Sequence, residues 1–235
     1  ALPVLRIDEP TLEMTFKVNN SPFAGREGQF VTARQIQERL DNQLETDVSL
    51  KVTPTDSPDA WTVAGRGELH LSILIENMRR EGFELQVSKP QVILKDIDGV
   101  LHEPFERVQA EVPEEYSGAV IESLGQRKGE MVDMVTTDNG LTRLIFNVPA
   151  RGLIGYTTEF MSMTRGYGII NHTFDEFRPR IKGRIGGRRN GVLVSMDQGS
   201  ASEYAILGLE DRGINFMEPG TDVYEGMIVG QNNRE

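Results

Sequence analysis

The chain has 235 residues, of which 38% are hydrophobic and 26% charged, and its formal net charge is −11. This length suits two or three domains, and the composition is that of a folding chain, not of a disordered one. The absence of cysteine excludes disulfide frameworks and thiolate metal sites. No apolar run approaches the roughly 18 residues that a membrane helix needs. We therefore expect a cytoplasmic protein with no membrane partner, and the start at Ala1 suggests a fragment or a processed product.

The first 89 residues predict one small α+β domain. Residues 12–18 alternate apolar and polar side chains, as a half-buried strand does. Thr32 and Gln35 form a capping-box pattern before a helix of about 13 residues, on which Ile36, Leu40 and Leu44 share one face. Strands at 48–52 and 61–64, a helix at 67–80 and a strand at 83–87 complete the predicted order β-α-β-β-α-β.

The same order is predicted again between residues 90 and 178. After an irregular stretch, the patterns indicate a strand, a helix, a strand pair with a hairpin signal at Asp138-Asn139-Gly140, a helix and a strand, at 106–112, 114–126, 130–137, 141–148, 150–164 and 169–174. This order is typical of the ferredoxin-like split βαβ plan, an antiparallel sheet with two helices on one face. Residues 179–235 predict an incomplete third unit, with a strand at 191–195, a helix at 200–209 and short β segments near Val223 and 227–230.

Positive charge is concentrated in one segment. Residues 178–189 carry six of the 25 basic side chains and no acidic one, within a chain that is otherwise acidic. One interpretation is a solvated linker that its like charges keep extended. The other is a phosphate-contacting loop, because guanidinium groups bind phosphate oxygens in pairs and glycine lets the backbone approach closely. No aromatic residue is interleaved, which argues against a platform for stacking bases.

Motifs for catalysis are missing from the sequence. No window matches the phosphate-binding P-loop, the three histidines lie in different segments, and no nucleophile and base can be paired by spacing. We therefore expect no enzyme activity, cofactor or metal in this chain. Two kinds of turn remain open to interpretation: the Arg127-Lys128 turn is either an ordinary helix-to-strand connection or an RNA-contacting tip, and Arg66 and Arg151 mark either tight helix starts or phosphate sites.

Several longer motifs resemble one family. Gly65-Arg-Gly-Glu-Leu-His-Leu71 and its continuation to residue 84, followed by residues 88–92, resemble domain III and its junction to domain V in translational GTPases such as elongation factor G. The likeness is closest to the TypA/BipA branch, in order along the chain at residues 7–11, 20–25, 148–155, 160–164, 190–195 and 224–230. The resemblance covers essentially the whole chain.

The resemblance implies a C-terminal piece of a GTP-hydrolysing, ribosome-binding factor for stress adaptation and large ribosomal subunit assembly. It implies a domain III-like part at 1–89, a domain V-like part at 90–178 and an incomplete family-specific domain at 179–235. GTP and Mg²⁺ would bind a GTPase domain absent from this chain. Contacts with that domain would involve Arg66, Glu68 and His70. Large-subunit rRNA would be contacted by Arg127, Lys128, Arg151, Lys182, Arg184, Arg188 and Arg189.

The resemblance further implies a monomer, with contact to tRNA only through a missing C-terminal part. Two other interpretations of the sequence stay open. Paired ferredoxin-like domains often hold a small metabolite between them, so a regulatory binding module is the main alternative. An autonomous enzyme is the second, and the missing catalytic motifs argue against it.

Overall fold

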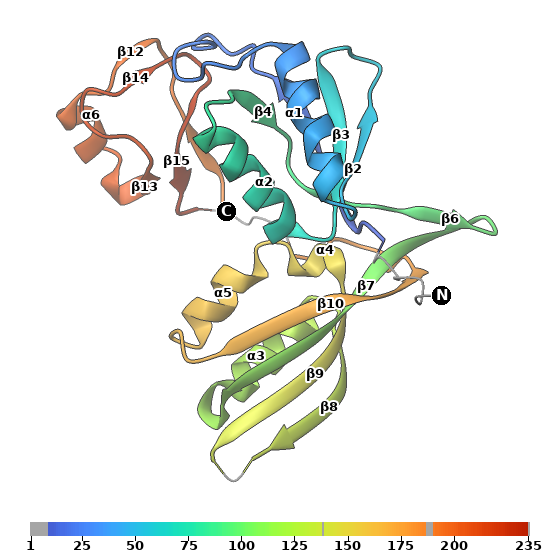
Figure 1. Cartoon of the computed structure of the whole chain (residues 1–235). Helices are drawn as coiled ribbons and strands as arrows, with labels where there is room; N and C mark the ends of the chain where they lie inside the picture. Colours follow the sequence, from blue (N-terminus) through green and yellow to red (C-terminus); the bar gives the residue numbers. More distant parts are fainter. Residues whose placement is uncertain (1–8, 138, 187–189, 235) are drawn as a thin grey trace. The chain divides into compact units, whose positions relative to one another are not determined.

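The computed structural model describes residues 9–137, 139–186 and 190–234, and it is a mixture of helices and antiparallel sheets (Figure 1). The predicted α+β class is confirmed. Its contacts separate two compact units, one within Ala1–Asn19 and Ala24–Gly187 and the other within Asn20–Phe23 and Arg188–Glu235. The predicted three-domain division at residues 89 and 178 stays a prediction.

The first part of the larger unit has the predicted β-α-β-β-α-β order. Its elements are β1 (Leu12–Val18), α1 (Ala33–Thr46), β2 (Lys51–Pro54), β3 (Ala60–Gly65), α2 (Glu68–Arg80) and β4 (Leu85–Val87). The antiparallel sheet has the ferredoxin-like strand order β2-β3-β1-β4, with the short β5 (Gln91–Val92) also pairing with β1. Both helices pack with β1 and β3 into one core. The fully buried side chains of this core include Phe16, Ile36, Leu40, Val63, Leu71 and Met78.

Local signals in the sequence set most boundaries of this part. The capping box at α1 is formed, since Thr32 accepts from the Gln35 backbone N–H and Gln35 accepts from that of Thr32. The strand predicted at 48–52 is wrong at its start, because Val48 is exposed and β2 begins only at Lys51. The reason is a side-chain turn: the Asp47 carboxylate accepts from both the N–H and the hydroxyl of Ser49 and holds the chain out of the sheet.

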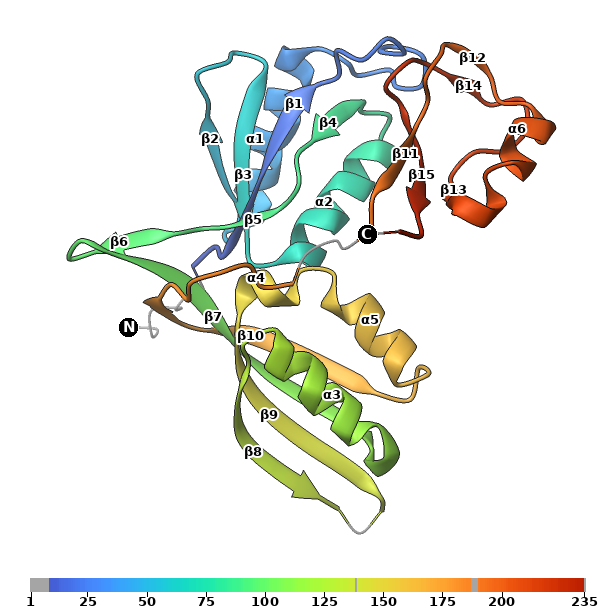
Figure 2. The same cartoon turned by 180° about the vertical axis from the view of Figure 1, so that it is seen from behind.

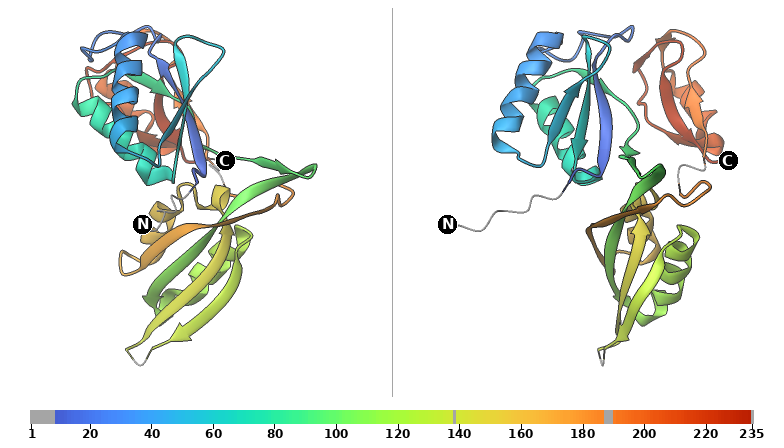
Figure 3. Two further views of the ribbon diagram at one scale, coloured as in Figure 1. Left: turned by 45° about the vertical axis from the view of Figure 1, so that its right-hand side comes forward. Right: turned by 90° about the vertical axis from the view of Figure 1, so that its right-hand side faces the viewer.

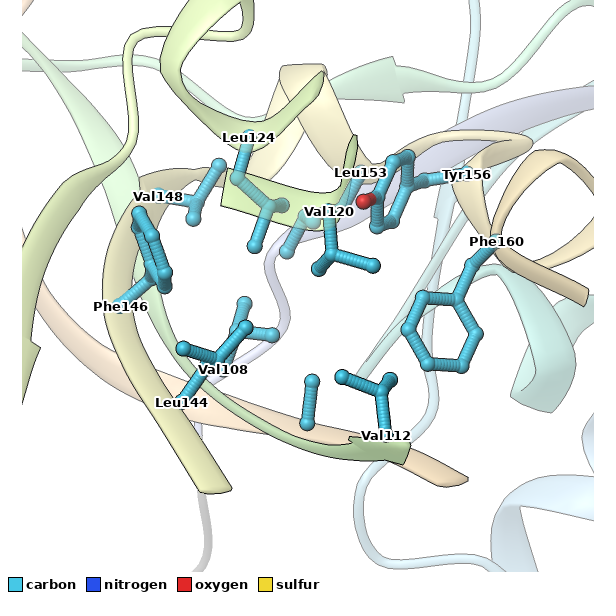
Figure 4. Packing of buried hydrophobic residues seen from close by; sticks show 11 residues of the cluster. Val108, Val112, Val120, Leu124, Leu144, Phe146, Val148, Leu153, Tyr156 and Phe160 are labelled. Atoms are coloured by element: carbon cyan, nitrogen blue, oxygen red, sulfur yellow. The ribbon is translucent and has the colours of Figure 1, made fainter. Parts of the chain in front are cut away.

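The second part repeats the order around a longer sheet. Its elements are β6 (Lys95–Ile97), β7 (Val100–Pro113), α3 (Glu114–Gln126), β8 (Glu130–Thr136), β9 (Leu141–Pro149), α4 (Ala150–Leu153), α5 (Tyr156–Met163) and β10 (Ile169–Pro179). The strand order is β10-β7-β9-β8, and β6 pairs with β7. Helices α3 and α5 cover one face of this sheet (Figures 2 and 3). Figure 4 shows the core between these helices and the sheet, where Val120, Leu124 and Phe160 point toward strand side chains such as Val108 and Leu144.

Three predictions for this part are corrected. The strand predicted at 106–112 already begins at Val100, because its first residues pair with β6 and with the end of β10. The helix predicted at 150–164 is broken into α4 and α5, because Ile154 is extended and Gly155 has a φ of +74°. The last strand runs to Pro179, beyond the predicted end at residue 174, so Arg178 belongs to the sheet. The hairpin after β8 has Gly140 at a φ of +73°, as the turn signal predicts, while Asp138 lies outside the described residues.

The smaller unit consists of short elements. They are β11 (Val192–Val194), β12 (Gly199–Ser200), α6 (Glu203–Leu207), the 3-10 turn η1 (Glu210–Arg212), β13 (Gly213–Asn215), β14 (Asp222–Val223) and β15 (Ile228–Asn232). The helix predicted at 200–209 is shorter, since Ser202 caps it by accepting from Ala205 N–H at 3.2 Å and Gly208 ends it. Within the described residues, no helix is long and apolar enough to cross a membrane.

Candidate nucleic-acid interface

The basic segment continues directly from β10 as a turn, residues 180–186, which we call the basic turn. Its isoleucines face inward, since Ile181 is half-buried and Ile185 is buried, whereas Arg180, Lys182 and Arg184 are exposed. A freely solvated linker would bury neither isoleucine, so that interpretation does not fit these residues. Arg188 and Arg189, which belong to the same predicted segment, lie outside the described residues.

A buried ion pair fixes the basic turn to the sheet. The Glu103 side chain of β7 is fully buried and accepts from Arg151 Nε and Nη2 and, at 2.9 Å, from the Ile181 N–H. The same Arg151 guanidinium donates to the carbonyl oxygens of Ile181, at 2.5 Å, and Gly183, at 2.7 Å. One arginine thus satisfies a buried carboxylate and two turn carbonyls at once, a task that its fork of donors allows.

Arg127 makes a second attachment beside the first. Its guanidinium donates to the Gly152 carbonyl oxygen at 2.5 Å and to Glu159, and it lies 4.8 Å from the centre of the Tyr156 ring. The basic turn passes so close that a Cβ on Gly186, whose φ is +58°, would lie 2.9 Å from Arg127 Nη1. A Cβ on Gly152 would lie 3.1 Å from the Ile185 side chain. Glycine at both positions therefore permits the close approach.

The predicted RNA-contacting residues fall into two groups. Arg127 and Arg151 have carboxylate partners and side chains only 14% and 13% exposed, so little of either guanidinium faces solvent. Lys128, Lys182 and Arg184 are exposed and have no ion-pair partner among the residues that the structure describes. Phosphate contact by any of the five stays a prediction. The geometry gives Arg127 and Arg151 an internal role that the sequence did not indicate.

Arg178, at the end of β10, is also occupied internally. It forms ion pairs with Asp175 and Glu176 and lies 3.5 Å from Glu130, while its guanidinium covers the Phe105 ring. The charge pattern of the sequence alone groups this residue with the basic segment. The outward-facing positive charge of the described segment therefore comes from Arg180, Lys182 and Arg184.

The three residues expected to face a GTPase domain lie around the start of α2. The Arg66 N–H donates to His70 Nδ1 at 3.1 Å, so Nε2 carries the hydrogen that His70 donates to Asp47 at 2.5 Å. Burial raises the pKa of Asp47, but hydrogen bonds from His70 and Ser49 outweigh it and lower the pKa to about 2. Glu68 accepts from the Gly155 N–H at 2.9 Å. His70 thus joins α2 to the end of α1, and a contact with another domain stays a prediction.

The ion pair between β10 and β7 is a further contact that spacing along the chain does not predict. His172 of β10 lies 2.7 Å from the buried Glu106 carboxylate of β7, and the hydrogen bond with Glu106 raises the pKa of His172 against the opposing effect of burial. The register that places Phe174 opposite Glu106 brings the two side chains together across neighbouring strands. No signal within either strand alone reveals this pair. Among the described residues, no three His, Asp or Glu side chains group as a metal site would require.

Residues 100–183, which include strands β7 to β10 of the second sheet and the start of the basic turn, match the family model described as the elongation factor G C-terminus, so this part is an α+β module of the translation-factor type. Residues 190–235 match the model of the TypA/BipA C-terminal domain. The predicted resemblance to the TypA/BipA family is thereby confirmed.

Curated relatives agree over the whole chain. Proteins named large ribosomal subunit assembly factor BipA are 72% identical in Bacillus subtilis, 55% in Synechocystis and 51% in Escherichia coli K12, each over 234 residues and 100% of this chain. The chain spans only 38% to 39% of the length of these relatives. None of these matches supports the small-metabolite alternative. A shallow pocket on α2 is lined by that helix alone, through Ser72, Ile73, Glu76, Asn77 and Arg80.

Proposed function

We propose that this chain is the ribosome-binding arm of a TypA/BipA-type translational GTPase that acts in large ribosomal subunit assembly and stress adaptation. The family and the names of the relatives support a role at the large subunit. The observation that carries the proposal is the basic turn. It exposes Arg180, Lys182 and Arg184 on a fixed backbone in a chain whose net charge is −11.

The arm would dock by phosphate contacts with large-subunit rRNA. Each contact releases condensed counterions, so affinity should fall steeply as salt rises. The net charge of −11 would also disfavour RNA contact elsewhere on the chain and so favour docking through the basic turn. GTP and Mg²⁺ would bind only in a separate GTPase domain of the cytoplasmic, monomeric factor. Rotation of rigid domains would then link docking to GTP hydrolysis, and tRNA contact would belong to other parts of the protein.

Co-sedimentation with purified large ribosomal subunits across a KCl titration tests this proposal. Lys182→Glu/Arg184→Glu should weaken binding and reduce the slope of log K against log salt by about 0.7–0.9 per lost contact. The matched control is Arg79→Glu/Arg80→Glu on α2, which changes the net charge equally at side chains that are 68% and 73% exposed. Equal losses for both pairs would indicate nonspecific charge attraction. An unchanged slope for the turn variant would refute the assigned contacts.

A further inference from the structure

The Glu103–Arg151 pair lies at an unusual place for charges. Glu103 is fully buried in β7, where an apolar side chain would normally pack. Buried ion pairs seldom stabilise a fold more than apolar residues of similar volume do, because both ions lose their hydration. The pair is therefore poorly explained as a device for stability alone. Its polar contacts instead converge on the backbone of the basic turn.

Building on the proposed function, we propose that Glu103 and Arg151 are positioning residues for RNA docking, which hold the turn backbone so that Lys182 and Arg184 project together toward RNA phosphates. The pair grips the chain on both sides of Lys182: Glu103 accepts from the Ile181 N–H, and Arg151 donates to the carbonyls of Ile181 and Gly183. Burial of the Ile185 side chain anchors the backbone directly after Arg184. Backbone freedom is thus removed before RNA arrives, which lowers the entropy cost of docking.

The geometry argues against direct phosphate contact by Arg151 itself. To reach a phosphate, the guanidinium would have to leave Glu103. The buried carboxylate would then lose both of its arginine donors, at a large cost in free energy. It would also release the two carbonyls that define the turn. A contact by Arg151 would therefore dismantle the surface that presents Lys182 and Arg184. The two roles exclude each other.

Glu103→Gln separates positioning from simple charge attraction. Removing a negative charge from this acidic chain should strengthen RNA binding if only net charge matters. Positioning gives the opposite sign: we expect binding to large ribosomal subunits about five- to tenfold weaker, with Arg151→Met similar and the double variant no worse than either single one. The control is Leu144→Ala, which removes a buried side chain of the same domain without touching the pair. It should bind as the unmodified chain does.

A second readout needs no ribosome. Trypsin should cleave the free chain after Lys182 and Arg184 several-fold faster in Glu103→Gln and Arg151→Met than in Leu144→Ala, as followed by mass spectrometry. Unchanged cleavage, or tighter subunit binding by Glu103→Gln, would overturn this inference while leaving the proposed function standing. If the unmodified chain does not bind large subunits, the proposed function fails and the docking role fails with it. Faster cleavage would then show only that the pair holds the turn.

Discussion

Replacing Arg151 with methionine should lower the free energy of unfolding by about 3–5 kcal/mol, the usual cost of leaving one member of a buried ion pair without its partner. Glu103 is fully buried and has three donors, of which the variant removes both arginine N–H groups and leaves only the Ile181 N–H. Methionine retains most of the apolar stem, so loss of packing adds little. For a unit of about 150–250 residues, the size class of the larger unit, the expected fall in melting temperature is about 6–20 °C.

Urea unfolding followed by circular dichroism measures this loss, and a double variant tests its cause. Glu103→Leu/Arg151→Met removes both charges, so most of the lost stability should return, because the penalty comes from an uncompensated buried carboxylate. Lys182→Glu is the exposed control and should change stability by less than about 0.5 kcal/mol. A loss below about 1 kcal/mol in the single variant, or a double variant as unstable as the sum of its parts, would refute the reasoning.

Three other perturbations have expected outcomes. The lowered pKa of Asp47, about 2, adds stability that is present above its unfolded value of about 3.9 and is lost as pH falls toward 2, so urea midpoints of wild type and Asp47→Asn should converge over that range. The raised pKa of His172 adds stability that is complete below a pH of about 6.5, its unfolded pKa, and is lost as pH rises through the folded pKa. The variant His172→Gln should therefore lose less stability than wild type as pH rises above about 6.5. A parallel loss in both proteins would contradict this. The variant Gly168→Ala should destabilise the fold, because the added Cβ would lie 2.6 Å from the Phe160 ring. The variant Gly118→Ala in α3, where a Cβ would meet nothing within 4 Å, should stabilise it by about 0.5–1 kcal/mol. Equal effects of the two variants in calorimetry would exclude the packing argument.

Element order could be predicted from sequence because it depends on local periodicity. The alternation in β1 and the capping box at Thr32 specify their elements without reference to the rest of the chain. The errors occur where one residue's backbone or side chain overrides the pattern. Gly155 breaks a helix by adopting a left-handed conformation, and Asp47 delays a strand by binding the following serine.

The candidate site could be predicted only in part. A run of basic residues is visible in the sequence, but its partners are not, because Arg127 meets Glu159 across 32 residues and Arg151 meets Glu103 across 48. Such pairs depend on strand register and on how α4 packs, which no short window contains. The sequence pattern alone therefore groups internal and outward-facing cations together. Burial separates them.

The contacts of Arg151 also determine which substitutions the basic turn can tolerate. Under the proposed docking role, positions 182 and 184 need a cation at the surface, so exchanging lysine and arginine there should cost less function than the same exchange at position 151. At position 151 a lysine carries the same charge but lacks the planar array of donors that reaches a carboxylate and two carbonyls together. Basic residues of equal charge therefore differ in how freely they can be replaced: Arg151 is restricted by its hydrogen-bond partners, and Lys182 and Arg184 are restricted less.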